Sequence, residues 1–106
     1  MLDGKFIRGT TPTHQFVLPF DRAFIKELSI TYCQNDEVVI KRNKEECEII
    51  DNTVTVTLTQ QDSLSFWPDE IVEVQIKLLT YDGEVLASPK YRIAVEDALD
   101  TEVFDA

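Results

Sequence analysis

Apolar and polar residues alternate strictly from Thr53 to Thr59, which reads Thr-Val-Thr-Val-Thr-Leu-Thr. Successive side chains of a strand point to opposite faces, so Val54, Val56 and Leu58 share one face and the threonines share the other. A strand with one apolar and one polar face is typical of an antiparallel sheet that covers a core on one side. The pattern therefore indicates a fold class, although it carries no chemistry.

The same two-residue period recurs along the chain at nearly regular spacing. One helical turn at 21–24 is expected to lead into a strand that ends at Cys33, and the longest strand is expected at 71–81. Asp82-Gly83 is the strongest hairpin signal, because a tight two-residue turn needs positive φ. The alternation breaks at 59–70, which we interpret as a crossover between sheets.

These segments add up to about seven or eight strands. Hairpins between neighbours and one crossover predict an all-β fold, namely an antiparallel immunoglobulin-like or fibronectin-like sandwich, with a small β-barrel as the alternative. The length suits one domain. We expect a single β-sandwich domain over residues 1–96 and an acidic C-terminal tail over residues 97–106.

Charge narrows the set of partners. Twenty acidic and ten basic residues give a net charge of −10, and eleven of the acids with only three of the bases lie in residues 54–106. This balance opposes binding to a phosphate backbone, so no nucleic-acid partner is expected. No apolar run approaches the roughly 20 residues that span a bilayer, and the N-terminus lacks the apolar stretch of a secretory signal. We expect a cytoplasmic protein with no membrane partner.

The residues that usually carry chemistry are few. His14 is the only histidine, and no motif supplies a catalytic partner for it, so we interpret it as a strand residue at a sheet edge. Cys33 and Cys47 are expected to be free thiols, with Cys33 on a polar face or near an edge. The calcium loop pattern is absent around Asp62. The sequence predicts no catalytic, cofactor-binding or metal-binding residue and no cofactor.

Candidate contact residues remain. Trp67 lies in a loop, where it would be either a lid on the core, the interpretation we favour, or an exposed binding anchor. The tail from Glu96 carries five acids and no base, and its apolar Leu99 and Phe104 suit a docking segment. The polar face of the threonine strand is a further candidate surface, formed by Thr53, Thr55, Thr57 and Thr59.

Four segments carry a resemblance to a known group of proteins. They are Arg8–Asp21, Ile30–Gln34, Leu58–Phe66 and Val74–Ser88, so the likeness spans roughly residues 6–100. They resemble small uncharacterised proteins encoded in phages and prophages of Gram-positive (Firmicutes) gut bacteria. The resemblance implies a prophage protein made together with virion structural proteins, and it implies no catalytic residue. The residues before Arg8 and the cysteine at 33 depart from the pattern.

Two hypotheses about function follow. The first is a non-enzymatic phage or prophage structural or accessory protein that acts through protein–protein contacts, with other phage structural proteins or with itself, in the cytoplasm of the bacterial host or assembled into a virion. The alternative is a carbohydrate-binding or host-surface recognition module built on Trp67, Tyr81 and Tyr91. Two further hypotheses, which we favour less, are a hydrolase centred on His14 and an acidic mimic of DNA.

Overall fold

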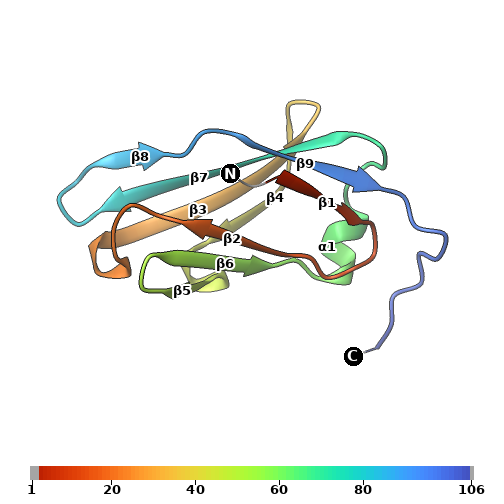
Figure 1. Ribbon diagram of the computed structural model, residues 1–106, viewed down its shortest axis with the longest axis horizontal. Helices are drawn as coiled ribbons and strands as arrows, with labels where there is room; N and C mark the ends of the chain where they lie inside the picture. Colours follow the sequence, from red (N-terminus) through yellow and green to blue (C-terminus); the bar gives the residue numbers. More distant parts are fainter. Residues whose placement is uncertain (1–2, 106) are drawn as a thin grey trace.

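The computed structural model describes residues 3–105 and shows an all-β sandwich of two open sheets (Figure 1). The strands are β1 (Asp3–Ile7), β2 (Thr13–Val17), β3 (Ile25–Gln34), β4 (Glu37–Asn43), β5 (Glu48–Ile50), β6 (Thr53–Thr57), β7 (Ile71–Thr80), β8 (Val85–Ala87) and β9 (Tyr91–Glu96). The helical pieces are η1 (Arg22–Phe24), η2 (Lys44–Glu46) and α1 (Gln60–Leu64). The predicted fold class is confirmed, and the barrel alternative is wrong because both sheets have free edges.

The larger sheet has the order β1-β9-β7-β3-β4, and β8 also pairs with β7. The smaller sheet has the order β2-β6-β5. In immunoglobulin nomenclature β9-β7-β3-β4 corresponds to G-F-C-C′ and β2-β6-β5 corresponds to B-E-D, as in the two sheets of the variable-type sandwich. The pairing is antiparallel as predicted, except that β1 runs parallel to β9. The core lies between the sheets and includes Tyr32, Phe66 and Val54.

The threonine strand is β6, the central strand of the smaller sheet. Val54 and Val56 are buried, as the alternation requires, and Thr53, Thr55 and Thr57 point away from the core. Each side of β6 pairs in antiparallel register, with β2 on one side and β5 on the other.

The long connection after β6 carries the chain from the smaller sheet to the larger, as predicted. The structure adds the short helix α1, which the sequence analysis interpreted only as a turn. Thr59 caps this helix: its hydroxyl accepts the Asp62 N–H at 3.0 Å, and Asp62 Oδ2 accepts the Thr59 N–H at 2.9 Å. Such a reciprocal capping box satisfies two backbone donors that the first turn leaves free.

One further expectation needs correction. Residues 3–105 form nine strands rather than seven or eight, because Pro89 lies between β8 and β9, which pair with the two halves of β7. Cys33 lies on an outer face, as predicted, in the interior strand β3. Both Cys33 and Cys47 are free, and they are partly buried. Within residues 3–105, no helix is long and apolar enough to span a bilayer.

Candidate interaction surfaces

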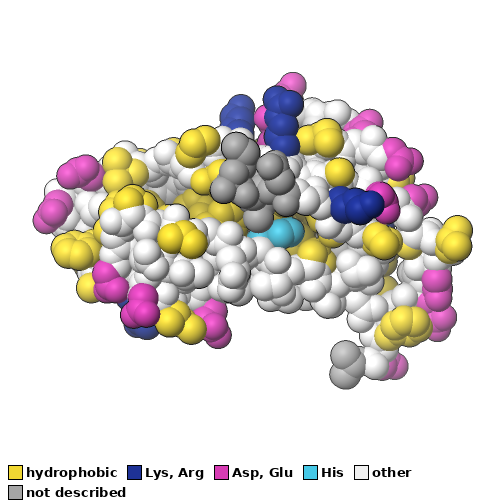
Figure 2. Space-filling view, viewed as in Figure 1, with side chains coloured by type: hydrophobic (Ala, Val, Ile, Leu, Met, Phe, Trp, Pro, Cys, Tyr) yellow, Lys and Arg dark blue, Asp and Glu magenta, His cyan; other side chains and the backbone are white. Residues whose placement is uncertain are grey.

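Apolar side chains gather at the end of the sandwich formed by the β2–β3 and β7–β8 connections. They are Phe20, which is half-buried, Phe24, Tyr81 and Leu86, which are 57%, 66% and 38% exposed. We call these four residues the loop-end cluster. Figure 2 shows hydrophobic and acidic side chains together at this end, on the left of the view. Exposed aromatic groups of this kind are enriched at protein contacts.

Hydrogen bonds hold the two loops of the cluster together. Asp21 accepts the Ala23 N–H and so caps the turn that contains Phe24. The Tyr81 N–H donates to the Phe24 carbonyl at 3.1 Å, which joins one loop to the other. The cluster is therefore ordered before any partner arrives, and an ordered site loses less conformational entropy on binding.

The β7–β8 turn is fixed by its own contacts. The Gly83 N–H donates to the Thr80 carbonyl, and the Thr80 hydroxyl accepts the Glu84 N–H. Gly83 has φ +88°, a left-handed conformation that glycine adopts without strain. The predicted hairpin at Asp82-Gly83 is confirmed, but its loop has three residues rather than two, because the Thr80 N–H donates to the Glu84 carbonyl across Tyr81, Asp82 and Gly83.

A shallow hollow of about 200 Å³ lies at the cluster. Its lining is Phe20, Phe24, Thr80, Asp82, Glu84 and Leu86. Two carboxylates thus stand at the rim of an apolar floor. An apolar floor with an acidic rim fits a protein surface that offers an apolar side chain beside lysine or arginine.

Trp67 lies in the crossover between α1 and β7, at the other end of β7 from Tyr81. Its side chain is 52% exposed, whereas its neighbour Phe66 is only 1% exposed. The interpretation of Trp67 as a lid on the core is therefore wrong, because Phe66 fills that place. The buried amide of Gln34 holds the backbone: its Oε1 accepts the Trp67 N–H at 2.7 Å, and its Nε2 donates to the Trp67 carbonyl at 2.9 Å.

A hollow of about 300 Å³ lies beside this tryptophan and is lined by Gln34, Glu37, Val38, Val39, Ser65 and Trp67. The three aromatic residues of the predicted sugar platform do not meet. Trp67 and Tyr81 flank opposite ends of the ten-residue strand β7, and Tyr91 is half-buried with its ring 5.9 Å from that of Phe16. Trp67 and Tyr81 are both exposed but do not form a shared stacking surface.

The threonine face is smaller than predicted. Thr53, Thr55 and Thr57 lie on the outer face of β6, where Thr57 contacts the Thr13 hydroxyl at 3.0 Å. Thr59 does not belong to this face, because it lies beyond the strand and its hydroxyl caps α1. The face is uncharged apart from Glu48 of the neighbouring strand β5.

The tail leaves the body of the molecule after β9 (Figure 1). Leu99 is fully exposed and Phe104 is 65% exposed. The side-chain amide of Gln60 exchanges two hydrogen bonds with the backbone of Phe104, at 2.8 and 2.9 Å. Arg8 pairs with Asp97 at 2.8 Å at the root of the tail. The tail is thus tethered to α1 at one point while its apolar side chains stay in solvent.

His14 lies in the edge strand β2, as predicted, but its side chain points into the core and is 8% exposed. Its Nδ1 lies 2.7 Å from the Tyr32 hydroxyl. Burial lowers the pKa of His14 and raises the pKa of Tyr32, so the imidazole is neutral, the phenol keeps its proton, and one hydrogen bond joins the two. The partner is a protonated phenol rather than an activated nucleophile, and this pair has a structural role.

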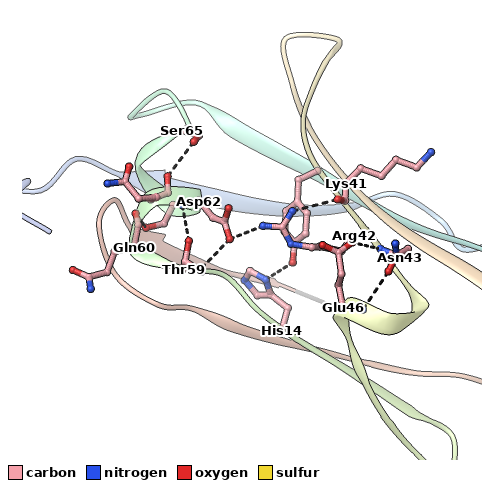
Figure 3. Close-up of polar contacts among 12 residues, drawn as sticks. His14, Lys41, Arg42, Asn43, Glu46, Thr59, Gln60, Asp62 and Ser65 are labelled. Carbon is pink, nitrogen blue, oxygen red and sulfur yellow. Dashed lines mark hydrogen bonds and ion pairs between the residues drawn. The ribbon is translucent and has the colours of Figure 1, made fainter. Parts of the chain in front are cut away.

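Asp62 has a structural role (Figure 3). Besides capping α1, it forms an ion pair with Arg42 of β4 at 2.6 Å. Partial burial opposes its ionisation, yet hydrogen bonds from Arg42 and Thr59 hold the pKa of Asp62 below its ordinary value. Among residues 3–105, no group of three or more histidine, cysteine, aspartate or glutamate side chains is arranged to hold a metal ion.

Comparison with known proteins finds a likeness in structure but none in sequence. No family model and no curated protein matches the chain. Among solved structures, the V domain of amphioxus IgVJ-C2 is similar over 90% of this chain and 99% of that chain, with 11% sequence identity and a TM-score of 0.36. The assignment to the immunoglobulin-like sandwich rests on the strand order of the two sheets.

Sequence reasoning missed the loop-end cluster. Phe20 and Phe24 are 61 and 57 residues from Tyr81 along the chain, and no local pattern connects them. One signal was present. Tyr81 directly precedes the Asp82-Gly83 turn, so its side chain had to lie near the tip of a hairpin, where aromatic residues are seldom needed for the core.

Proposed function

We propose that this chain is a non-enzymatic structural or accessory protein of a phage or prophage, and that it acts by binding another protein through the loop-end cluster. The observation that carries the proposal is an ordered, exposed aromatic cluster with carboxylates at its rim. The resemblance over residues 6–100 supports the phage context. The partner would be a virion protein whose surface presents an apolar side chain flanked by basic residues.

The test is co-purification from a host in which the prophage is induced. Tagged wild-type protein is compared with Phe24→Ser and with Ile71→Ser, a matched change at an apolar residue that is 51% exposed on β7. We expect virion proteins to co-purify with the wild type and with Ile71→Ser, and at least tenfold less with Phe24→Ser. Equal recovery with all three proteins, or no virion protein with any, would contradict the proposal.

The acidic rim adds a second readout. Surface charge pairs are screened by salt, so binding through Asp82 and Glu84 should weaken as ionic strength rises. The variant Asp82→Asn with Glu84→Gln should bind more weakly at low salt and should lose most of this salt dependence. An unchanged salt dependence in that variant would exclude the rim from the contact.

A second candidate function rests on Trp67. An exposed tryptophan with a fixed backbone beside a hollow is suited to stacking against a sugar ring. A glycan array probed with wild type, Trp67→Ala and Phe24→Ser separates the two candidates. Binding lost only in Trp67→Ala would favour carbohydrate recognition, and absence of glycan binding by the wild type would remove this candidate.

A further inference from the structure

The free edge of β2 is the starting point. β2 is an outer strand of the smaller sheet and pairs only with β6 among the described strands. The Leu18 N–H donates to the Asn52 carbonyl, and the Pro12 carbonyl accepts the Leu58 N–H, so the even-numbered residues face β6. The backbone groups of Thr13, Gln15 and Val17 therefore point away from the sheet.

This edge lacks the usual protection against further pairing. Natural sheets guard their edges with charged residues, proline, bulges or very short strands. Among the other edge strands of the described chain, β1 carries Lys5, β4 carries Lys41, the three-residue β5 carries Glu48, and the three-residue β8 is followed by Pro89. β2 has five residues, Thr-His-Gln-Phe-Val, and none of them is charged at neutral pH. Pro12 and Pro19 lie outside the strand, and the Pro12 carbonyl is turned toward β6, so neither proline interrupts the outer edge. It is open to an added strand.

The tail has the pattern that such a strand needs. In an extended conformation Leu99, Thr101 and Val103 share one face, while Asp100 and Glu102 share the other. The stretch has five residues, the length of β2. It belongs to no strand in the structure, and all five residues are exposed. Residues 99–103 thus have the alternation of a strand but pair with no strand of the described structure.

We propose that the tail of one copy adds as a strand to the β2 edge of a second copy. Leu99, Thr101 and Val103 then face the core side of the sheet, beside His14 and Phe16. Asp100 and Glu102 face solvent beside uncharged residues of β2, where no like charge opposes them. Main-chain hydrogen bonds supply the affinity in this mode of recognition.

The contact joins two different surfaces. Two copies that exchange tails form a closed dimer, whereas one-way contacts continue head to tail into an open chain or a ring. This assembly uses neither Phe24 nor Tyr81. It is therefore independent of the loop-end cluster, and one proposal can fail without the other.

The test is the mass of the full-length protein in solution, measured by light scattering after size-exclusion chromatography over a wide range of concentration. We expect the wild type to form concentration-dependent multiples of 12.2 kDa. The variant Leu99→Asp with Val103→Asp should be monomeric, because it places carboxylates on the face that meets the core. The matched control, Asp100→Asn with Glu102→Gln, changes only the solvent face and should still assemble.

A mixing experiment identifies the acceptor. Gln15→Pro removes an N–H that points away from β6, so it blocks the edge and leaves the pairing with β6 intact. This variant and the tail variant should each be monomeric, and their mixture should form a one-to-one complex. If Gln15→Pro fails to fold by circular dichroism, a labelled peptide of residues 97–106 is titrated into the tail variant, with a scrambled peptide as control.

Three outcomes overturn the proposal. The first is a wild type that stays monomeric at every concentration, as it would if the tail paired with β2 of its own chain. The tail variant assembles as well as the wild type. In the absence of a folded edge variant, the tail peptide binds no better than its scrambled control.

Discussion

The neighbours of His14 explain why a polar side chain is tolerated at a buried position. It is a polar residue at an apolar position of an alternating strand, and the structure places it beside Tyr32, with the two rings 5.6 Å apart. A buried polar group is tolerated when it is hydrogen-bonded, and the phenol satisfies that requirement. The hydrogen bond joins β2 of the smaller sheet to β3 of the larger sheet.

This pair predicts a dependence of stability on pH. The pKa of His14 is lower in the folded state than its ordinary value of 6.5, so folding favours the neutral ring. Its contribution is complete above that value and is lost as the pH falls through the folded pKa. The free energy of unfolding, measured by urea denaturation, should therefore decrease as the pH falls from about 7.5 to about 5.5, one unit to either side of the ordinary histidine pKa of about 6.5.

The double variant His14→Phe with Tyr32→Phe removes both partners of the hydrogen bond. It should show a flatter dependence over the same pH range, since neither new side chain titrates. His14→Phe alone leaves the phenol without a partner and should lose about 1–3 kcal/mol at neutral pH. A wild type whose stability is constant across this range would exclude the buried neutral state of His14.

At the scale of elements, the β7–β8 hairpin was the most predictable part of the chain. Gly83 has φ +88° and nothing stands within 4 Å of where its Cβ would lie. Substitution there strains only the backbone. Gly4 also has open space around it but lacks a positive φ, which makes it a matched control.

Gly83→Ala should lower the free energy of unfolding by about 1 kcal/mol, because a left-handed conformation disfavours a Cβ. For a domain of this size that corresponds to a fall of roughly 4–8 °C in melting temperature. Gly4→Ala should change it little, as is usual for exposed positions. Calorimetry of the two variants makes the comparison, and equal losses in both would contradict it.

The helix α1 was less predictable. Its five residues follow the threonine strand without an apolar stripe, and its capping residue Thr59 continues the alternation of β6. The structure ends the strand at Thr57 because Asp62 draws the Thr59 backbone into a capping box and pairs with Arg42. A partner in β4, distant in sequence, thus decides where β6 stops.

At the scale of the whole molecule, the net charge of −10 is the dominant property. Three ion pairs are present in the described chain, so most carboxylates have no basic partner. Excess charge of one sign destabilises a compact state by self-repulsion, and salt screens that repulsion.

The melting temperature should therefore rise by several degrees as NaCl increases from about 10 mM to about 300 mM, where the Debye length falls from roughly 30 Å to below 10 Å. Differential scanning fluorimetry measures it. The variant Asp82→Asn with Glu84→Gln carries two fewer negative charges and should respond less. A melting temperature that falls with salt would show that ion pairs outweigh repulsion.

The sequence by itself determined which residues alternate, and so it determined the fold class, the buried face of β6, the helical turn before β3 and the Asp82-Gly83 hairpin. These are local properties, fixed by side-chain period and by the φ that a turn demands. Only the tertiary structure decided that Phe66 is buried and Trp67 exposed, that Phe24 lies beside Tyr81, and that β2 keeps a free edge. Each of these depends on contacts between distant segments, whose packing no local pattern encodes.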